Sequence, residues 1–557
     1  MLGQSWLGSA AGNYSPFDTT GDRLDVVGWR HHHQLDRGVH MRKIIASAAA
    51  VALSAGLATA SPAVARGGDH HHANDSQRLV KGVTVNGILQ HLRAFQAIAD
   101  RNDGNRASGL SGHVASLDYV AKRLKKAGYN VTKQPFTFAF SRDLAPATLS
   151  QTAPEAKDFE THSFDYSGSG DVTGTVVPID LVLPPPAEPG STSGCEAADF
   201  PAAPAGDAVA LMQRGTCTFA DKANNAAAAG YDAAIIFNEG QEGRQELLTG
   251  TLGEPVAIPV VGLSFADGQS LAQTDGAQVH VTTSTENDPN RTTYNLIADL
   301  PKKQARKVKH PDQVVVVGAH LDSVAAGPGI NDNGSGSATI LEIAEELAEA
   351  KPRALQRPVR FAFWGAEEAG LLGAEHYVAN LSPEQLSTIY ANLNFDMLGS
   401  TNYVRFVYDG NGSEGGQAGP AGSDAIESIF TDWFDRKNLA SAPTDFDGRS
   451  DYGPFIDAGI PAGGLFSGAE GVKTEEQAAT YGGTAGAAYD ACYHAECDDM
   501  SNISTKALHE FGDAAAHATW VMLTAKQGLH PDGSIAPKKF SKKSAGLTPG
   551  SLHHSVR

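Results

Sequence analysis

The spacing of apolar residues predicts helices and a strand in the first ordered part of the chain. Helical spacing begins near Thr84, and the i, i+3, i+4, i+7 pattern from Leu117 to Leu124 predicts a helix that ends at Gly128. Apolar and polar residues then alternate over residues 129–140, which is the pattern of a half-buried strand. This part therefore combines helices with an extended segment.

The pattern changes between residues 141 and 290. Short apolar runs alternate there with turns rich in proline and glycine, and one helical segment lies among them. We interpret this stretch as a separate β-rich module. Its predicted strands include Gly174–Leu183, Ala208–Met212 and Ala233–Phe237, and its helix is Phe219–Ala229.

After Thr293, nearly continuous apolar strands alternate with amphipathic helices. Such alternation predicts an α/β sheet covered by helices on both faces. The predicted strands are Gln313–Gly318, Val359–Trp364 and Tyr390–Phe395, and the helices lie around Ile340–Leu347 and at Thr505–Thr524.

The two ends of the chain differ from the middle in composition and in the role that we expect for them. Residues 41–65 combine a basic start, an alanine-rich apolar run and a small-residue cleavage site, which predicts a secretory signal peptide. Residues 1–40 are then an upstream extension outside the protein proper, and the alternative is an N-terminal segment followed by a signal anchor. Residues 66–77 are polar, with a histidine tract expected in solvent, and residues 527–557 are expected to form a mobile tail.

Composition narrows the possible classes of protein. The 557 residues are 41% apolar, enough for about two to four domains with real cores. The formal charge of −20 argues against a partner that is nucleic acid or an anionic membrane. The four cysteines suit two disulfides in an exported protein.

Residues that commonly bind metals collect at the ends of the predicted strands. In open α/β sheets the carboxyl ends of strands border the ligand crevice, so side chains far apart in sequence converge there. Two imidazoles and three carboxylates fit two zinc ions that share one carboxylate, and an adjacent acid would remain free to move protons. The candidates are His320, Asp322, Asp332, Glu367, Glu368, Asp396 and His494.

Each of these motifs also has an ordinary explanation. A histidine near an aspartate is usually a surface turn, an aspartate before a helix is usually an N-cap, and paired glutamates usually face solvent. Their occurrence together at successive strand ends is what favours a metal site.

The segments Gly318–Ala338, Phe361–Gly373 and Asn394–Leu398 resemble the secreted M28 zinc aminopeptidases of the Streptomyces and aminopeptidase Y type. The resemblance extends from about Val83 to Leu523. Asp332 follows His320 by 12 residues and Asp396 follows Glu368 by 28, as in that family. The resemblance implies a mixed sheet flanked by helices over residues 78–140 and 291–526. This is the zinc-exopeptidase (phosphorylase/hydrolase-like) fold.

The resemblance also implies roles for individual residues. One zinc ion would be held by His320, Asp332 and Asp396, and the second by Asp332, Glu368 and His494. Asp322 would orient His320. Glu367 would be the general base and Tyr493 would stabilise the oxyanion. Cobalt or manganese could occupy the same ligands, and no calcium ligand set can be matched.

Three further residues match positions near the substrate in such enzymes. Arg449 would lie near the substrate carbonyl or product carboxylate, or else form an ion pair with Asp447 or Asp451. Met397 and Phe466 would line an apolar side-chain pocket, or else pack in the core.

Residues 141–290 resemble a protease-associated (PA) domain, notably around Arg214–Phe219 and Ile258–Gly262. Such domains cover a cleft or select substrate and contribute no catalytic residue. We expect one disulfide within it, Cys195–Cys217. A second, Cys492–Cys497, would fix the loop that carries Tyr493. The alternative is free buried thiols.

The expected function is that of a secreted, monomeric metalloaminopeptidase that acts on peptide and protein N-termini with large apolar residues such as leucine. One alternative is a carboxypeptidase of the same superfamily, which would need a cationic pocket that we do not find. The other is a non-catalytic binding protein built on the PA domain.

Overall fold

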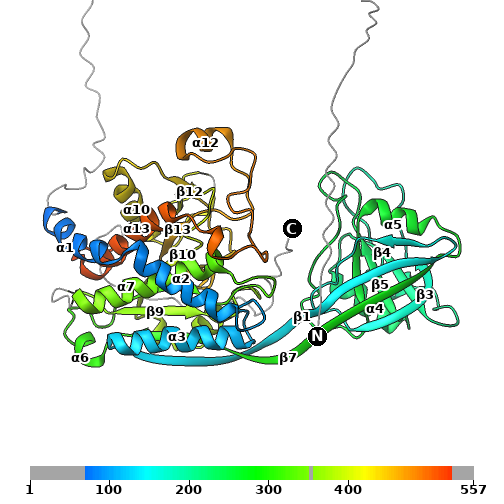
Figure 1. Cartoon of the computed structure of the whole chain (residues 1–557), viewed down its shortest axis with the longest axis horizontal. Coiled ribbons are helices and arrows are strands. Elements are labelled where there is room, and N and C mark those ends of the chain that lie inside the picture. Colours follow the sequence, from blue (N-terminus) through cyan, green and yellow to red (C-terminus); the bar gives the residue numbers. More distant parts are fainter. Residues whose placement is uncertain (1–68, 351–354, 415, 530–557) are drawn as a thin grey trace, which may run out of the picture. The chain divides into compact units, whose positions relative to one another are not determined.

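The computed structural model describes residues 69–350, 355–414 and 416–529 (Figure 1). The predicted signal peptide at 41–65, the extension at 1–40 and all but the first three residues of the 527–557 tail lie outside the described residues. Among the helices described, none is both long and apolar enough to cross a membrane.

Within the described residues, thirteen strands form a mixed sheet, as the α/β prediction requires. Ten of its neighbouring pairs follow the order β12-β11-β13-β10-β8-β9-β7-β3-β4-β5-β6, and β1 pairs with β2 and β7. The strands are β1 (Asn130–Ala153), β2 (Lys157–Phe159), β3 (Gly170–Pro178), β4 (Ala208–Gln213), β5 (Ala233–Phe237), β6 (Val260–Leu263), β7 (Gln278–Asp299), β8 (Val314–His320), β9 (Val359–Trp364), β10 (Ile389–Asp396), β11 (Phe406–Tyr408), β12 (Ala442–Thr444) and β13 (Ala462–Phe466).

Helices lie before, between and after the strands. The α-helices are α1 (Asp69–Gly82), α2 (Val85–Ala99), α3 (Ser111–Ala127), α4 (Phe219–Ala228), α5 (Phe265–Ala272), α6 (Lys302–Ala305), α7 (Gly336–Ala350), α8 (Leu372–Ala379), α9 (Pro383–Leu386), α10 (Ser423–Arg436), α11 (Gly453–Asp457), α12 (Glu475–Tyr481) and α13 (Thr505–Thr524). Short helical turns are η1 (Ala197–Asp199), η2 (Ile330–Ser335) and η3 (Met500–Asn502).

The valine strand β8 shows why helices cover both faces of the sheet. Successive side chains of a strand point to opposite faces. Val315 and Val317 belong to the large core that includes α2, α3, α7 and α13, whereas Val316 belongs to a smaller core with α8 and α11. All three are fully buried, so a continuous apolar run is what this position demands.

The two long strands β1 and β7 run through both predicted boundaries of the β-rich module. They pair antiparallel from Asn130 opposite Asp299 to Ala153 opposite Gln278. The expected strand at 129–140 therefore continues 13 residues further. The pairing register shifts three times between Phe138 and Thr148, and irregular pairing of this kind hides the strand from a search for strict alternation.

The β-rich module has a small parallel sheet of its own. Strands β3 to β6 pair in parallel, with α4 packed on one face and α5 on the other. The predicted runs at Ala208–Met212 and Ala233–Phe237 are both strands. The run at Gly174–Leu183 is a strand only as far as Pro178.

The expectation of a polar segment in solvent at residues 66–77 is wrong at Ser76, which is buried, whereas the exposure of its histidine tract stays a prediction. Helix α1 begins at Asp69 and packs against α13. Leu79 and Val80, at its other end, are buried. Tertiary packing thus continues a helix into a stretch that has no apolar pattern of its own.

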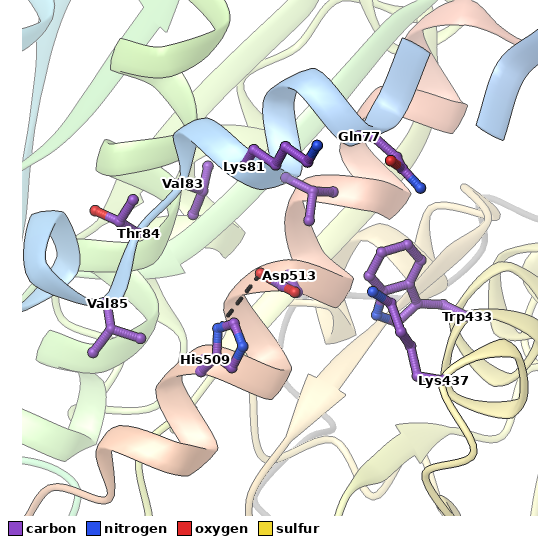
Figure 2. Close-up of a pocket in the computed structure, with 10 residues that line it drawn as sticks. Gln77, Lys81, Val83, Thr84, Val85, Trp433, Lys437, His509 and Asp513 are labelled. Atoms are coloured by element: carbon purple, nitrogen blue, oxygen red, sulfur yellow. Dashed lines mark ion pairs between the residues drawn. The ribbon is translucent and has the colours of Figure 1, made fainter. Parts of the chain in front are cut away.

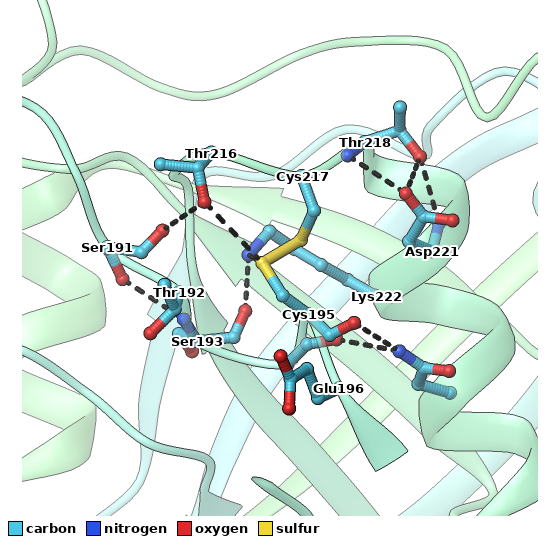
Figure 3. Close-up of a disulfide and its surroundings, with 12 residues drawn as sticks. Ser191, Thr192, Ser193, Cys195, Glu196, Thr216, Cys217, Thr218, Asp221 and Lys222 are labelled. Carbon is cyan, nitrogen blue, oxygen red and sulfur yellow. Dashed lines mark hydrogen bonds between the residues drawn. A yellow bond between two sulfur atoms is a disulfide. The ribbon is translucent and has the colours of Figure 1, made fainter. Parts of the chain in front are cut away.

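Both expected disulfides are present, Cys195–Cys217 and Cys492–Cys497. Figure 3 shows Cys195 and Cys217 among the side chains of Ser193, Thr216 and Lys222. The buried Lys222 ammonium donates a hydrogen bond to the carbonyl of Ser193. The disulfide and this bond fix the loop before β4 to the start of α4.

Replacing both Cys195 and Cys217 by serine should destabilise the protein more than replacing Cys492 and Cys497. The first bridge spans 22 residues and the second spans 5. Chain entropy predicts losses of about 3 and about 2 kcal/mol respectively. Calorimetric unfolding of the two double variants beside the parent tests this, and equal losses would contradict the entropic explanation.

Candidate functional site

The predicted site residues lie at the carboxyl edge of three parallel strands. His320 is the last residue of β8, Asp396 is the last residue of β10, and Glu367 and Glu368 follow shortly after β9. Strand β8 pairs in parallel with both β9 and β10. Since parallel strands end at the same edge, these four side chains are brought to one place.

Asp332 reaches the same place from the loop before α7. It lies in η2, and the backbone N–H groups of Asn331 and Asp332 donate to the two carboxylate oxygens of Asp498, each at 2.9 Å. The Asp498 carboxylate thereby fixes the direction in which Asp332 points.

Imidazole nitrogen and carboxylate oxygens are in close contact around His320. Its Nε2 lies 3.2 Å from Asp332 Oδ1, 3.3 Å from Asp396 Oδ1 and 3.7 Å from Glu367 Oε2. On the other side of the ring, Nδ1 lies 3.7 Å from Asp322 Oδ1. His320 is almost completely buried, so these contacts are screened little by water.

The second imidazole, His494, faces the other side of Asp332. Its Nε2 lies 3.2 Å from Asp332 Oδ2 and 2.9 Å from Glu368 Oε2. The two oxygens of Asp332 therefore face two different imidazoles. His494 belongs to the tight loop that the Cys492–Cys497 disulfide closes, and its backbone has a positive φ of 56°.

The donor set suits divalent metal ions. Nitrogen and oxygen atoms of His320, Asp332 and Glu368 lie within 4.8 Å of one another, as do those of His320, Glu367 and Asp396. Ligand atoms placed about 2.0–2.1 Å from a tetrahedral zinc ion lie about 3.4 Å apart, close to the separations observed. Glu368 Oε1 and Asp396 Oδ1 are buried and accept no hydrogen bond within the described structure, so each has a lone pair available.

Burial and charge shift the pKa values of the glutamates. Burial raises the pKa of Glu367 well above its usual value; the His320 charge opposes this shift, and Asp396 and Asp451 reinforce it. Burial, together with the charge of Asp332, raises the pKa of Glu368 to about 7. Both shifts disfavour the ionised form of these carboxyls.

The histidines shift in the complementary direction. Burial by itself would lower the pKa of His320, but the charges of Glu367 and Asp396 raise it well above the usual value. The pKa of His494 rises to about 10, because hydrogen bonds to Asp332 and Glu368 outweigh burial. Both shifts favour the protonated imidazoles, and a metal ion would bind at the same nitrogens in place of the proton.

Tyr493 and Arg449 lie together beside His494. The Tyr493 ring stacks on the His494 ring with centroids 3.8 Å apart. The Arg449 guanidinium donates to the Tyr493 hydroxyl at 3.2 Å and pairs with Glu470 at 2.7 Å. The expected alternative, an ion pair with Asp447 or Asp451, is wrong: the Arg449 guanidinium pairs with Glu470, and Asp447 accepts a hydrogen bond from the Arg449 backbone N–H.

Met397 and Phe466 lie next to the centre. Met397 directly follows Asp396, and Phe466 is opposite Asp396 in the β10–β13 register. Met397 is 2% exposed, whereas Phe466 is partly exposed and stacks on Phe406. Their part in binding a substrate stays a prediction.

Three buried residues that sequence reasoning did not select support the site. Arg106 is fully buried and donates to the carbonyls of Leu321, Pro328 and Gly329. Arg106 lies in a loop of small and polar residues, and no sequence pattern there indicates a buried position. Asp498 could have been noticed beside Cys497.

The third such residue, Asp451, is fully buried, and its carboxyl oxygens have no hydrogen-bond partner in the described structure. Burial raises its pKa well above the usual value. Its neighbour Ser450 donates to Asp396. Sequence reasoning considered Asp451 only as a partner of Arg449.

A cavity elsewhere in the molecule contains none of these residues. Figure 2 shows it beside α1, α10 and α13, where Lys81, Trp433 and Asp513 are among its lining side chains. We do not assign it to the candidate site.

The sequence matches two family models. Residues 295–519 match peptidase family M28, and residues 172–271 match the PA domain. The expected resemblances are confirmed. Since α2, α3 and the start of β1 precede the PA match and pack on the same core as α7 and β8, the PA domain lies within the M28 fold.

Curated relatives cover most of the chain. An aminopeptidase of Pseudomonas aeruginosa is 48% identical over 80% of this chain and 83% of its own length. Leucine aminopeptidase 2 of Trichophyton tonsurans is 37% identical over 87% of this chain and 92% of its own length.

Solved structures share the fold. An aminopeptidase from Aneurinibacillus sp. strain AM-1 superposes with a TM-score of 0.61 at 24% identity, covering 83% of this chain and 98% of its own. BSAP, a zinc aminopeptidase from Bacillus subtilis, does so with a TM-score of 0.58 at 26% identity, covering 81% of this chain and 99% of its own. With relatives of this similarity along most of its length, the chain belongs to peptidase family M28 and carries a PA domain.

Proposed function

We propose that the protein is a zinc aminopeptidase that removes residues from the N-termini of peptides and proteins. The observation that carries the proposal is the position of Asp332, whose two oxygens face His320 and His494 at 3.2 Å each. The names of the curated relatives point to the same activity.

Two zinc ions would be held by the chain's own donors. His320, Asp332 and Asp396 would form one ligand set, and Asp332, Glu368 and His494 the other. The excess of buried carboxylates fits this, because each added cation offsets two negative charges. Zinc bound there supplies Lewis-acid polarisation of a carbonyl and a lower pKa for a nucleophilic water.

Glu367 is the proposed general base. It is buried beside the ligand atoms but belongs to neither proposed ligand set, so its carboxylate can accept the proton of the attacking water and deliver it to the leaving amine. The Glu367 N–H donates to Asp322 Oδ1 at 3.4 Å. Asp322 thereby contacts both the base and the His320 ring, which it would orient.

Tyr493 is the proposed donor to the tetrahedral oxyanion. Its hydroxyl accepts a hydrogen bond from Arg449, which leaves its own proton free to be donated to the substrate oxygen. The stacking on His494 and the disulfide on either side hold the ring in place. Arg449 would then act on the substrate through Tyr493.

The acidic surroundings favour a substrate with a free ammonium group. An internal peptide segment does not present that cation, so exopeptidase action at the N-terminus follows. Met397 and Phe466 would make the side-chain pocket apolar and favour leucine. A carboxypeptidase would need a free cation for the substrate carboxylate, whereas Arg106 is bonded to carbonyls and Arg449 to Glu470.

Export and a monomeric, extracellular state belong to the same proposal. The signal-like segment at 41–65 and the two disulfides support export. In the same proposal, the PA domain selects substrates and contributes no catalytic residue.

Leucyl-p-nitroanilide should be hydrolysed, and its N-acetyl derivative should not. A strong chelator should abolish the activity, and added zinc should restore it, with cobalt and manganese as parallel additions. Hydrolysis of both substrates would contradict the need for a free amine. Cleavage of only C-terminally free peptides would favour the carboxypeptidase alternative.

Glu367→Gln should lower kcat by a factor of about 10²–10⁴, because the amide cannot accept the proton. Metal content, measured by mass spectrometry, should not change. Glu375→Gln, an exposed change of the same kind on α8, serves as the control. Full activity in the Glu367 variant would exclude it as the base.

Tyr493→Phe should lower kcat by a factor of about 10²–10³ while KM changes little, because the lost hydrogen bond forms mainly in the transition state. Tyr481→Phe, the same change on α12, should leave both constants unaltered. An increase in KM alone would assign Tyr493 to substrate binding instead.

A further inference from the structure

A second group of side chains of the types that bind metals lies where α2, α3 and α7 pack together. His91 comes from α2, and Glu342 and Glu345 come from α7. One nitrogen or oxygen atom of each lies within 4.8 Å of the others. The group shares no residue with the site built on His320 and His494.

His91 points an unpartnered nitrogen at the two carboxylates. Its side chain is completely buried, and Nε2 makes no hydrogen bond within the described structure. Glu342 Oε2 lies 3.3 Å and Glu345 Oε2 lies 3.8 Å from this nitrogen. These nitrogen–oxygen distances are close to the separation of two ligand atoms on a tetrahedral zinc ion, about 3.4 Å. The same atoms do not have the geometry of a hydrogen bond.

The other ring nitrogen is already engaged. His91 Nδ1 lies 2.8 Å from the Tyr119 hydroxyl of α3. If Nδ1 carries the proton and donates it to that oxygen, Nε2 keeps a lone pair directed at the carboxylates. Histidines that bind metals commonly have their second nitrogen bonded in this way.

Both carboxylates are held in position by their surroundings. Arg123 of α3 donates to both oxygens of Glu345, which fixes the plane of that carboxylate. Glu342 occupies space that only a glycine at position 87 leaves open, since a Cβ there would overlap Glu342 Oε1. Glu342 is 9% and Glu345 18% exposed, so an ion could enter from solvent beside Glu345.

The local charge favours a cation. Burial raises the pKa of the neighbouring Glu346, and the charges of Glu342 and Glu345 raise it further. Of these three carboxylates, Arg123 pairs with Glu345. One imidazole nitrogen with two carboxylate oxygens is a zinc ligand set.

We propose that His91, Glu342 and Glu345 bind a further zinc ion that joins α2 to α7. It would stabilise the packing of the N-terminal helices on the helix that follows Asp332. It takes no part in the proposed peptide hydrolysis.

The zinc content of purified full-length protein tests this. Parent and variants are dialysed against micromolar zinc, desalted and analysed by mass spectrometry. Glu342→Gln should retain one zinc ion fewer per chain than the parent, and Glu345→Gln, a more exposed change, should do the same. Glu349→Gln, an exposed change on the same helix, should retain the parent's content.

The result is a difference between variants, so it does not depend on how many ions the proposed catalytic centre holds. Equal zinc content in all four proteins would overturn the proposal in favour of a plain ion pair. Should both glutamine variants fail to fold, anomalous diffraction at the zinc edge from parent crystals decides the matter. A peak within bonding distance of His91 Nε2 is expected, and its absence would overturn the proposal.

Discussion

Negative charge buried at one edge of the sheet is the constraint on which the site depends. Asp332, Glu367, Glu368 and Asp396 are brought together, largely out of water, with the buried His320 and the more exposed His494. Burying a charge without compensation is expensive. The pKa values of Glu367, Glu368, His320 and His494 are all raised, so each shift favours the protonated form and reduces the buried negative charge. Divalent cations at the same donors would remove this cost, which would link occupancy of the centre to the ionisation of Glu367.

The remainder of the site positions these charges. Asp498 holds the backbone that carries Asp332, and Ser450 donates to Asp396. Arg106 gathers three carbonyls of the segment between His320 and Asp332. These contacts join residues that are between 54 and 223 positions apart in sequence. A buried polar network of this kind tolerates few substitutions, because the loss of one member leaves another unsatisfied.

The sequence was informative where local patterns and fold geometry coincide. The valine run of β8 and the last helix, Thr505–Thr524, were predictable because each buries a continuous or periodic apolar set. The convergence of His320 with Asp396 followed from the rule that parallel strands end at one edge. The first turns of α1, the irregular half of β1 and the place of Arg106 were not predictable, since each depends on distant contacts. The same holds for Arg449, whose partner Glu470 lies 21 positions away.

The pairing of β1 with β7 has a consequence for how this architecture could arise. The chain leaves the peptidase sheet along β1 and returns along its direct neighbour β7, so the PA domain extends what would otherwise be a simple hairpin. Shortening both strands equally and joining them by a tight turn would keep the peptidase pairing of Asn130 with Asp299 intact. Gain or loss of the whole PA domain therefore requires no rearrangement of the peptidase sheet. The domain could be acquired or lost in evolution as one unit.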